Sequence, residues 1–310
     1  MPGAHLRTIW PALVSPRPTV RFRRERWSTP DGDFIDLDWL ASEPPAAPTP
    51  PPLVAMFHGL EGSSDSHYCR AMMAALRARG WRGVVVHWRG CSGEPNLLAR
   101  AYHSGDSDEV DWVLRRLRPD FVVGVSLGGN ALLKWLGEQA LDAVPVKAAV
   151  ALCAPQDLEA GATALARGVN RLYGRHFLRS LIPKSLEKLQ RFPGLYAGER
   201  VRAARDFFDF DGCVTAPLHG FRDAFDYWRR ASCKPFLAAI DCPTLVINPL
   251  DDPFLPASAL ARPDEVSSRV RLEYPASGGH VGFATGLPPG RIDWPARRAL
   301  RFFDEIRGGG

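Results

Sequence analysis

Between residues 53 and 153, short apolar runs alternate with longer amphipathic stretches, a pattern that few folds accommodate. The apolar runs predict buried strands, and they are Leu53 to Phe57, Gly83 to Trp88, Phe121 to Val125 and Val146 to Cys153. The amphipathic stretches predict helices, at about Tyr68 to Arg79, Asp106 to Arg118 and Gly128 to Ala140. Strands that are apolar throughout are typical of parallel sheets with both faces covered. The pattern therefore predicts an α/β fold with a mostly parallel, doubly wound sheet.

The alternation stops at Pro155, and the next stretch is helical in pattern, aromatic, and rich in arginine between Arg167 and Arg191. It resumes with two predicted strands and a closing helix, which are Thr244 to Asn248, Arg269 to Tyr274 and Trp294 to Ile306. Such an interruption is typical of a helical cap inserted into one sheet. A cap there would cover the carboxyl ends of the strands, where open α/β sheets bind ligands.

We interpret the chain, residues 1–310, as a single domain with a core at about 19–155 and 241–310 and a cap insertion at about 156–240. Near its start, the runs Thr19 to Trp27 and Phe34 to Leu40 alternate in polarity, which predicts antiparallel edge strands. The Pro/Ala-rich segment Glu43 to Pro52 predicts a loop, because consecutive prolines fix φ and remove backbone donors.

Composition indicates an ordinary globular protein, with 45% hydrophobic and 24% charged residues. The net charge of +5 comes from arginines spread along the chain, so we expect no nucleic-acid partner, although weak peripheral contact with anionic membranes is compatible with it. No apolar run approaches the roughly 20 residues that a membrane span needs. Arg7 and several prolines occupy the place of a signal peptide's apolar stretch, so we expect a soluble, cytoplasmic protein.

The six cysteines show no C-x-x-C pairing or regular spacing, and we interpret them as reduced thiols. They are Cys69, Cys91, Cys153, Cys213, Cys233 and Cys242. The chain contains no H-E-x-x-H, G-x-G-x-x-G or P-loop motif, and His87 and His103 lack partners at metal-ligand spacing. The sequence therefore predicts neither a metal nor a nucleotide cofactor.

The strongest local motif is Gly124-Val125-Ser126-Leu127-Gly128, which follows a predicted strand and opens a predicted helix. This is the context of a G-x-S-x-G nucleophile turn, in which the serine adopts a strained conformation and side chains two residues away would collide. The turn also places the hydroxyl at a helix N-terminus, which favours developing negative charge. A glycine-rich turn with an ordinary surface serine is the structural alternative. We predict Ser126 as the nucleophile.

A serine hydroxyl needs a base, and proteins with this motif order the chain as Ser, acid, then His. Only His176, His219 and His280 follow Ser126, and the first two fall in the predicted cap. His280 lies in a glycine-bearing loop directly after the last predicted strand, from where it can reach the serine. We predict His280 as the base, with a purely structural loop histidine as the alternative.

The acid must hold the tautomer of the imidazole and stabilise its charged form. Asp252 is our first candidate, because it follows the strand Thr244 to Asn248. Asp251 is the near alternative and Asp157, after the preceding strand, the distant one. One aspartate of the adjacent pair could instead cap the following turn.

An oxyanion needs two aimed backbone donors. We predict the amide of Leu127, directly after the nucleophile, and that of Leu60 in the loop after Phe57. His58 is expected to shape this loop rather than to act as a base.

Several stretches together resemble a known family. They are His5 to Thr8, His58 to Ser63, Arg89 to Asn96, Tyr102 to Gly105, Gly124 to Asn130, Thr215 to Phe221, Asp251 to Pro253 and Gly278 to Phe283. In these stretches the chain resembles the YheT-like branch of the α/β-hydrolases, with the plant EMB8-type proteins and the animal ABHD1/2/3-type lipid hydrolases. The segment from Arg167 to Arg191 is not matched, so substrate preference transfers least there.

The resemblance implies an α/β-hydrolase fold, no cofactor, and a triad of Ser126, Asp252 and His280. It also implies carboxylic ester substrates, from short acyl esters to glycerolipids, which are small-molecule partners. We therefore predict a serine esterase that works through an acyl-enzyme. The alternatives are a thioesterase or amidase with the same triad, and a non-catalytic ligand-binding protein of this fold. Acyl length, head group and oligomeric state are not fixed by the sequence.

Overall fold

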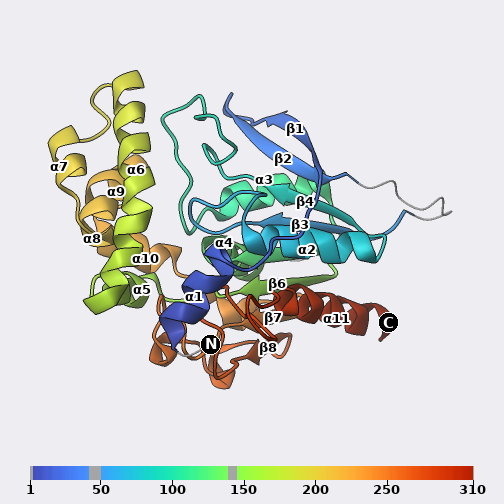
Figure 1. Ribbon diagram of the computed structural model, residues 1–310. Coiled ribbons are helices and arrows are strands. Elements are labelled where there is room, and N and C mark those ends of the chain that lie inside the picture. Colours follow the sequence, from blue (N-terminus) through green and yellow to red (C-terminus); the bar gives the residue numbers. More distant parts are fainter. Residues whose placement is uncertain (1–2, 42–49, 139–144, 310) are drawn as a thin grey trace.

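The computed structural model describes residues 3–41, 50–138 and 145–309. At its centre lies an eight-stranded sheet in the order β1-β2-β4-β3-β5-β6-β7-β8 (Figure 1). The strands are β1 (Phe22–Ser28), β2 (Phe34–Leu40), β3 (Leu53–Phe57), β4 (Arg82–Val86), β5 (Phe121–Val125), β6 (Ala148–Leu152), β7 (Thr244–Ile247) and β8 (Val270–Glu273). β2 runs antiparallel to β1 and β4, and all other neighbours are parallel. The prediction of a mostly parallel sheet is confirmed.

Helices cover both faces of this sheet (Figure 1). α3 (Ser107–Leu117) and α4 (Leu127–Glu138) pack into the core of one face. α2 (His67–Ala78) and α11 (Trp294–Gly308) pack into the core of the other. Successive residues of β3 alternate between these two cores because the side-chain period of a strand is two. This explains why the central strands are apolar throughout.

The chain between β6 and β7 forms a separate helical layer with its own small apolar core (Figure 1). Its elements are α5 (Leu158–Leu165), η2 (Gly168–Asn170), α6 (Arg171–Arg191), α7 (Gly198–Ala203), α8 (Phe207–Phe210), η3 (Asp211–Thr215), α9 (Ala216–Leu218), α10 (Ala224–Ala231) and η4 (Lys234–Ala239). Two short turns, η5 (Ala257–Ala259) and η6 (Pro263–Glu265), lie between β7 and β8. No helix in the described part of the chain is both long and apolar enough to cross a membrane.

The structure differs from the sequence-based expectations in two places. Helix α1 (Ala4–Leu13) was not predicted, because it contains Pro11 and begins without a side-chain cap. Of the two runs predicted as edge strands, only β1 lies at an edge of the sheet, because β2 also pairs with β4. Residues 43–49 of the expected loop, and the expected helix end at Ala140, lie outside the described residues.

The loop after β4 is anchored by buried charges. The Arg89 guanidinium donates to Glu109 Oε2 at 2.5 Å, Asp31 Oδ2 at 2.7 Å and Asp33 Oδ2 at 3.2 Å. Asp33 also accepts a hydrogen bond from the Asn96 side chain at 2.6 Å. The arginine and the asparagine at the two ends of the Arg89 to Asn96 motif therefore meet at one carboxylate, and the motif organises the loop beside the site.

We predict that Arg89→Met destabilises the protein by about 3–5 kcal/mol, because it leaves buried carboxylates without their cation. The matched control, Arg115→Met, breaks an exposed ion pair of 2.6 Å with Asp111 and should change stability far less, because solvent screens such a pair. Urea unfolding of both variants measures the difference. Equal losses of unfolding free energy in the two variants would show that the buried network stabilises the protein no more than an exposed ion pair does.

Candidate active site

The turn between β5 and α4 holds Ser126 in a left-handed backbone conformation, with φ of 52°. A Cβ atom on Gly124 would lie 2.5 Å from the carbonyl oxygen of Gly128, and one on Gly128 would lie 2.5 Å from that of Phe57. Both positions therefore require glycine, as the sequence motif predicts. The Ser126 amide donates to the Leu152 carbonyl at 2.8 Å, which ties the strained turn to β6.

His280 reaches Ser126 from the loop after β8. Its Nε2 lies 3.0 Å from Ser126 Oγ, although the two residues are 154 positions apart. Its backbone amide donates to Thr8 Oγ1 of α1 at 2.9 Å. Its ring stacks on that of Phe254, with centroids 3.9 Å apart and planes inclined by 10°. Backbone and ring are thus both held, which fixes the direction of the imidazole.

Asp252 completes the hydrogen-bonded chain. Its Oδ2 lies 2.8 Å from His280 Nδ1, and its Oδ1 accepts from the Phe254 amide at 2.8 Å. A carboxylate facing Nδ1 accepts the proton there, so Nε2 is left as the acceptor for the Ser126 hydroxyl. The structure therefore brings the three predicted residues together in one hydrogen-bonded chain.

The other aspartates considered have different partners. Asp251 accepts from the amides of Gly278 and Gly279 at 2.7 and 2.9 Å and from Arg7 Nη1 at 2.7 Å. Asp157 caps α5 by accepting from the Ala160 amide at 3.0 Å. Asp251 thus shapes the loop that carries His280, whereas Asp252 faces the imidazole.

Leu60 and Leu127, whose amides are the predicted oxyanion donors, line a cavity together with Ser126 and His280. The Leu60 amide has no hydrogen-bond acceptor among the described residues. His58 is buried and burial lowers the pKa of its imidazole to about 3, so the ring is neutral. It bonds the Gly59 carbonyl at 2.8 Å and the Trp88 amide at 3.3 Å, which gives it a shaping role in this loop.

Cys153 lies behind the relay, and ligand atoms of Cys153, Asp252 and His280 are within 4.8 Å of one another. Such a group could in principle hold a metal. Burial, followed by the charge of Asp252, raises the pKa of the thiol well above its usual value, so the sulfur is protonated. Its Sγ accepts from the Val281 amide at 3.3 Å. The donor set therefore fits a hydrogen-bonded relay better than a metal centre.

Two cavities lie at this site. The first, of about 90 Å³, contains Ser126 and is mainly apolar. Its walls include Leu158, Leu165, Phe177, Phe207 and Trp228. Phe207 and Trp228 thus belong to this wall, while the neighbouring Phe208 is 51% exposed and is not part of it.

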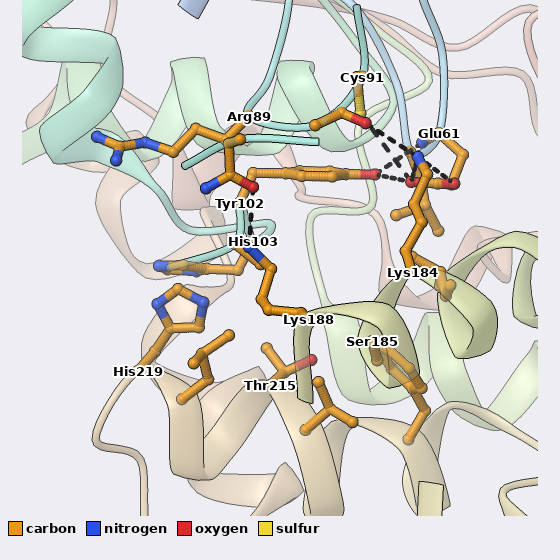
Figure 2. Close-up of a pocket in the computed structure, with 18 of the residues that line it drawn as sticks. Glu61, Arg89, Cys91, Tyr102, His103, Lys184, Ser185, Lys188, Thr215 and His219 are labelled. Atoms are coloured by element: carbon orange, nitrogen blue, oxygen red, sulfur yellow. Dashed lines mark hydrogen bonds and ion pairs between the residues drawn. The ribbon is translucent and has the colours of Figure 1, made fainter. Parts of the chain in front are cut away.

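The second cavity, of about 430 Å³, shares Leu60 and Leu127 with the first, and charged side chains such as Lys184 and Lys188 stand among its mainly apolar walls (Figure 2). Lys188 enters it from α6, and its ammonium donates to Asn96 Oδ1 and the carbonyls of Leu98 and Arg100 at 2.8 to 3.1 Å. Burial lowers the pKa of Lys188 to about 8. The two cavities thus adjoin at Leu60 and Leu127, and of the two only the first is lined by Ser126.

Sequence reasoning missed Thr8 and Phe254, which position His280. Thr8 belongs to a stretch that carries the family resemblance, but its long-range partner is invisible in the sequence. Phe254 directly follows the Asp-Asp-Pro stretch. Proximity to that stretch was the only available signal.

Comparisons with known proteins agree with this geometry. Residues 52–287 match the family described as alpha/beta hydrolase fold. The chain is 41% identical to YheT of Escherichia coli (strain K12), covering 92% of this chain and 85% of that protein. It is 29% identical to the embryogenesis-associated protein EMB8 of Picea glauca, covering 92% of this chain and 66% of that protein. It is also 29% identical to phospholipase ABHD3 of Mus musculus, covering 96% of this chain and 73% of that protein. The solved esterase EaEST from Exiguobacterium antarcticum shares the fold, with a TM-score of 0.56, 16% identity and coverage of 91% and 98%.

The chain belongs to the α/β-hydrolase fold family. Within it, the chain groups with the YheT-like proteins and their EMB8 and ABHD3 relatives, as the sequence motifs predict. The protein is a carboxylic ester hydrolase.

The partners of the two aspartates predict different mutant phenotypes. Asp252→Asn should lower kcat by roughly 10⁴-fold, because an amide favours the wrong imidazole tautomer. Asp251→Asn should lower kcat by no more than about tenfold, because it weakens only the loop that carries His280. Steady-state hydrolysis of p-nitrophenyl acetate measures both. A larger loss for Asp251→Asn would reverse their roles.

Proposed function

We propose that this protein cleaves carboxylic esters by nucleophilic catalysis at Ser126. The observation that carries the proposal is the continuous chain of contacts from Ser126 Oγ to His280 Nε2 at 3.0 Å and from His280 Nδ1 to Asp252 at 2.8 Å. Serine is weakly nucleophilic at neutral pH, and a base at this distance makes it reactive.

In the acylation step, Ser126 Oγ attacks the carbonyl carbon while its proton moves to His280 Nε2. The carboxylate of Asp252 stabilises the resulting imidazolium. The amides of Leu127 and Leu60 hold the oxyanion. The tetrahedral intermediate then collapses, His280 gives its proton to the departing alcohol, and the acyl group stays on Ser126.

In the second step a water molecule attacks the acyl-enzyme. His280 Nε2 removes a proton from the water, and the same two amides hold the second oxyanion. Collapse releases the carboxylic acid and returns the proton to Ser126 Oγ. Asp252 keeps the tautomer of the imidazole the same in both steps.

The two cavities suggest how an ester is divided. We propose that the acyl chain enters the apolar cavity lined by Phe207 and Trp228 and that the alcohol part faces the second cavity, which contains Lys188. The small apolar volume favours short acyl groups over long ones. Residues 156–240 serve as the cap in this proposal, because α5, α6, α8 and α10 contribute walls to the apolar cavity.

Labelling by a fluorophosphonate probe tests the nucleophile. Ser126→Ala should abolish labelling and lower kcat by roughly 10³-fold or more, while the unfolding temperature stays close to that of the parent. The matched control, Ser277→Ala, removes an exposed hydroxyl and should label normally. Undiminished labelling of Ser126→Ala would refute the assignment.

The proposed position of the acyl chain in the apolar cavity leads to a second prediction. Ala162 lines it from α5, so Ala162→Phe should lower kcat/KM for p-nitrophenyl butyrate about tenfold more than for the acetate. Thr163→Phe, on the exposed side of the same helix, is the control and should leave this ratio unchanged. Should Ala162→Phe leave the ratio unchanged as well, the acyl chain binds elsewhere.

A further inference from the structure

The start of α6 and the turn before it carry four arginines that the proposed chemistry does not use. Arg171, Arg175 and Arg179 follow one another at steps of four residues in α6, which places them along one side of the helix, and Arg167 precedes the short turn η2 that leads into it. All four are exposed. Within the described residues, none of them forms an ion pair, a side-chain hydrogen bond or a cation–π contact.

The second half of α6 behaves differently. Lys184 pairs with Glu61 at 2.8 Å, and Lys188 and Arg191 donate to oxygens of the loop after β4, Asn96 among them (Figure 2). These cations attach the helix to the core. The four arginines before them have no such structural task in the described part of the molecule, and their charge faces solvent.

Exposed apolar side chains gather beside these four arginines. Of the eleven large apolar side chains that are exposed in the described residues, six lie in residues 6–14 and 169–172. The most exposed of the six are Leu13, at 76%, and Leu172, at 62%. α1 lies next to the start of α6, where His5 Nδ1 is 3.1 Å from the Tyr173 hydroxyl (Figure 1). We call the exposed side chains of residues 5–14 and 167–180 the α1/α6 surface.

The α1/α6 surface borders the entrance to the active site. A groove of about 570 Å³ is lined by Thr8 and Ala12 of α1 and by His176 and Arg179 of α6, and it reaches Ser126. Neither segment of this surface contains an acidic residue. The guanidinium group of Arg179 therefore lies at the groove through which a substrate would enter, and the other arginines and the exposed apolar side chains belong to the same surface on one side of it.

We propose that the α1/α6 surface binds an anionic lipid bilayer and turns the groove toward it. Guanidinium groups pair with lipid phosphates, while exposed leucines enter the boundary between head groups and acyl chains. A nucleic acid would satisfy the arginines but leave the leucines in contact with water, which favours lipid. This inference goes beyond ester hydrolysis and does not depend on the identity of the nucleophile.

Vesicle sedimentation tests the proposal with the whole protein and no substrate. Vesicles of phosphatidylcholine containing about 30% phosphatidylglycerol should bind the protein, pure phosphatidylcholine should bind it much more weakly, and raising the salt to about 0.5 M should weaken the binding. Equal binding to both kinds of vesicle, or none to the anionic ones, would overturn the proposal.

The triple variant Arg167→Gln, Arg171→Gln, Arg175→Gln locates the binding surface. A basic side chain at an anionic membrane contributes about fivefold in partitioning, so loss of three should weaken binding roughly a hundredfold. The control variant Arg77→Gln, Arg118→Gln, Arg301→Gln removes the same charge from exposed positions on α2, at the end of α3 and on α11. This control should change vesicle binding less than about fivefold. Unfolding temperatures verify that both variants are folded. Equal losses in the two variants would contradict a localised surface.

The variant Leu13→Gln, Leu172→Gln separates lipid from nucleic acid. It should weaken vesicle binding about tenfold or more, because buried leucines contribute to membrane partitioning. Unchanged vesicle binding by this variant would overturn the apolar part of the proposal. Tighter, arginine-dependent binding of single-stranded RNA than of anionic vesicles would overturn the choice of partner.

Discussion

The close backbone approach around Ser126 determines where the rest of the site must lie. Gly124 and Gly128 each stand where a Cβ would come within 2.5 Å of a carbonyl oxygen, so the turn between β5 and α4 exists only with glycine at both places. The turn leaves Ser126 strained, at φ of 52°, with its amide bonded to β6. Strain of this kind persists only where the surroundings fix it. Here the central strands of the sheet supply that rigidity.

Loops from distant parts of the chain then converge on the fixed hydroxyl. The loop after β7 supplies Asp252 and Phe254, the loop after β8 supplies His280, and α1 supplies Thr8. Asp251 and Asp252 are neighbours with different tasks, since one binds the amides of the histidine loop and the other faces the imidazole. The helices between β6 and β7 add apolar walls at the same place. The rigid strands thus fix the position of the site, whereas the adaptable loops supply the side chains available for substrate contact.

Local patterns predicted the central fold well, because a buried parallel strand must be apolar on both faces and a nucleophile turn must have its glycines. They could not predict α1, whose helix contains Pro11 and depends on tertiary contacts such as that between Thr8 and His280. The sequence could not predict the contact between Asp251 and Arg7 either, because the two residues lie 244 positions apart. The unmatched arginines of α6 became interpretable only when their exposure and the neighbouring leucines were known.

The most direct measurement of the central claim is peptide mass spectrometry after rapid acid quenching of the reaction with p-nitrophenyl acetate. The relay of Ser126, His280 and Asp252 predicts an initial burst of nitrophenol and an acetyl group on the peptide that contains Ser126. The acetyl group should accumulate before the steady state and disappear as the substrate is consumed. Turnover without any acyl adduct, or an adduct on a different side chain, would contradict the account.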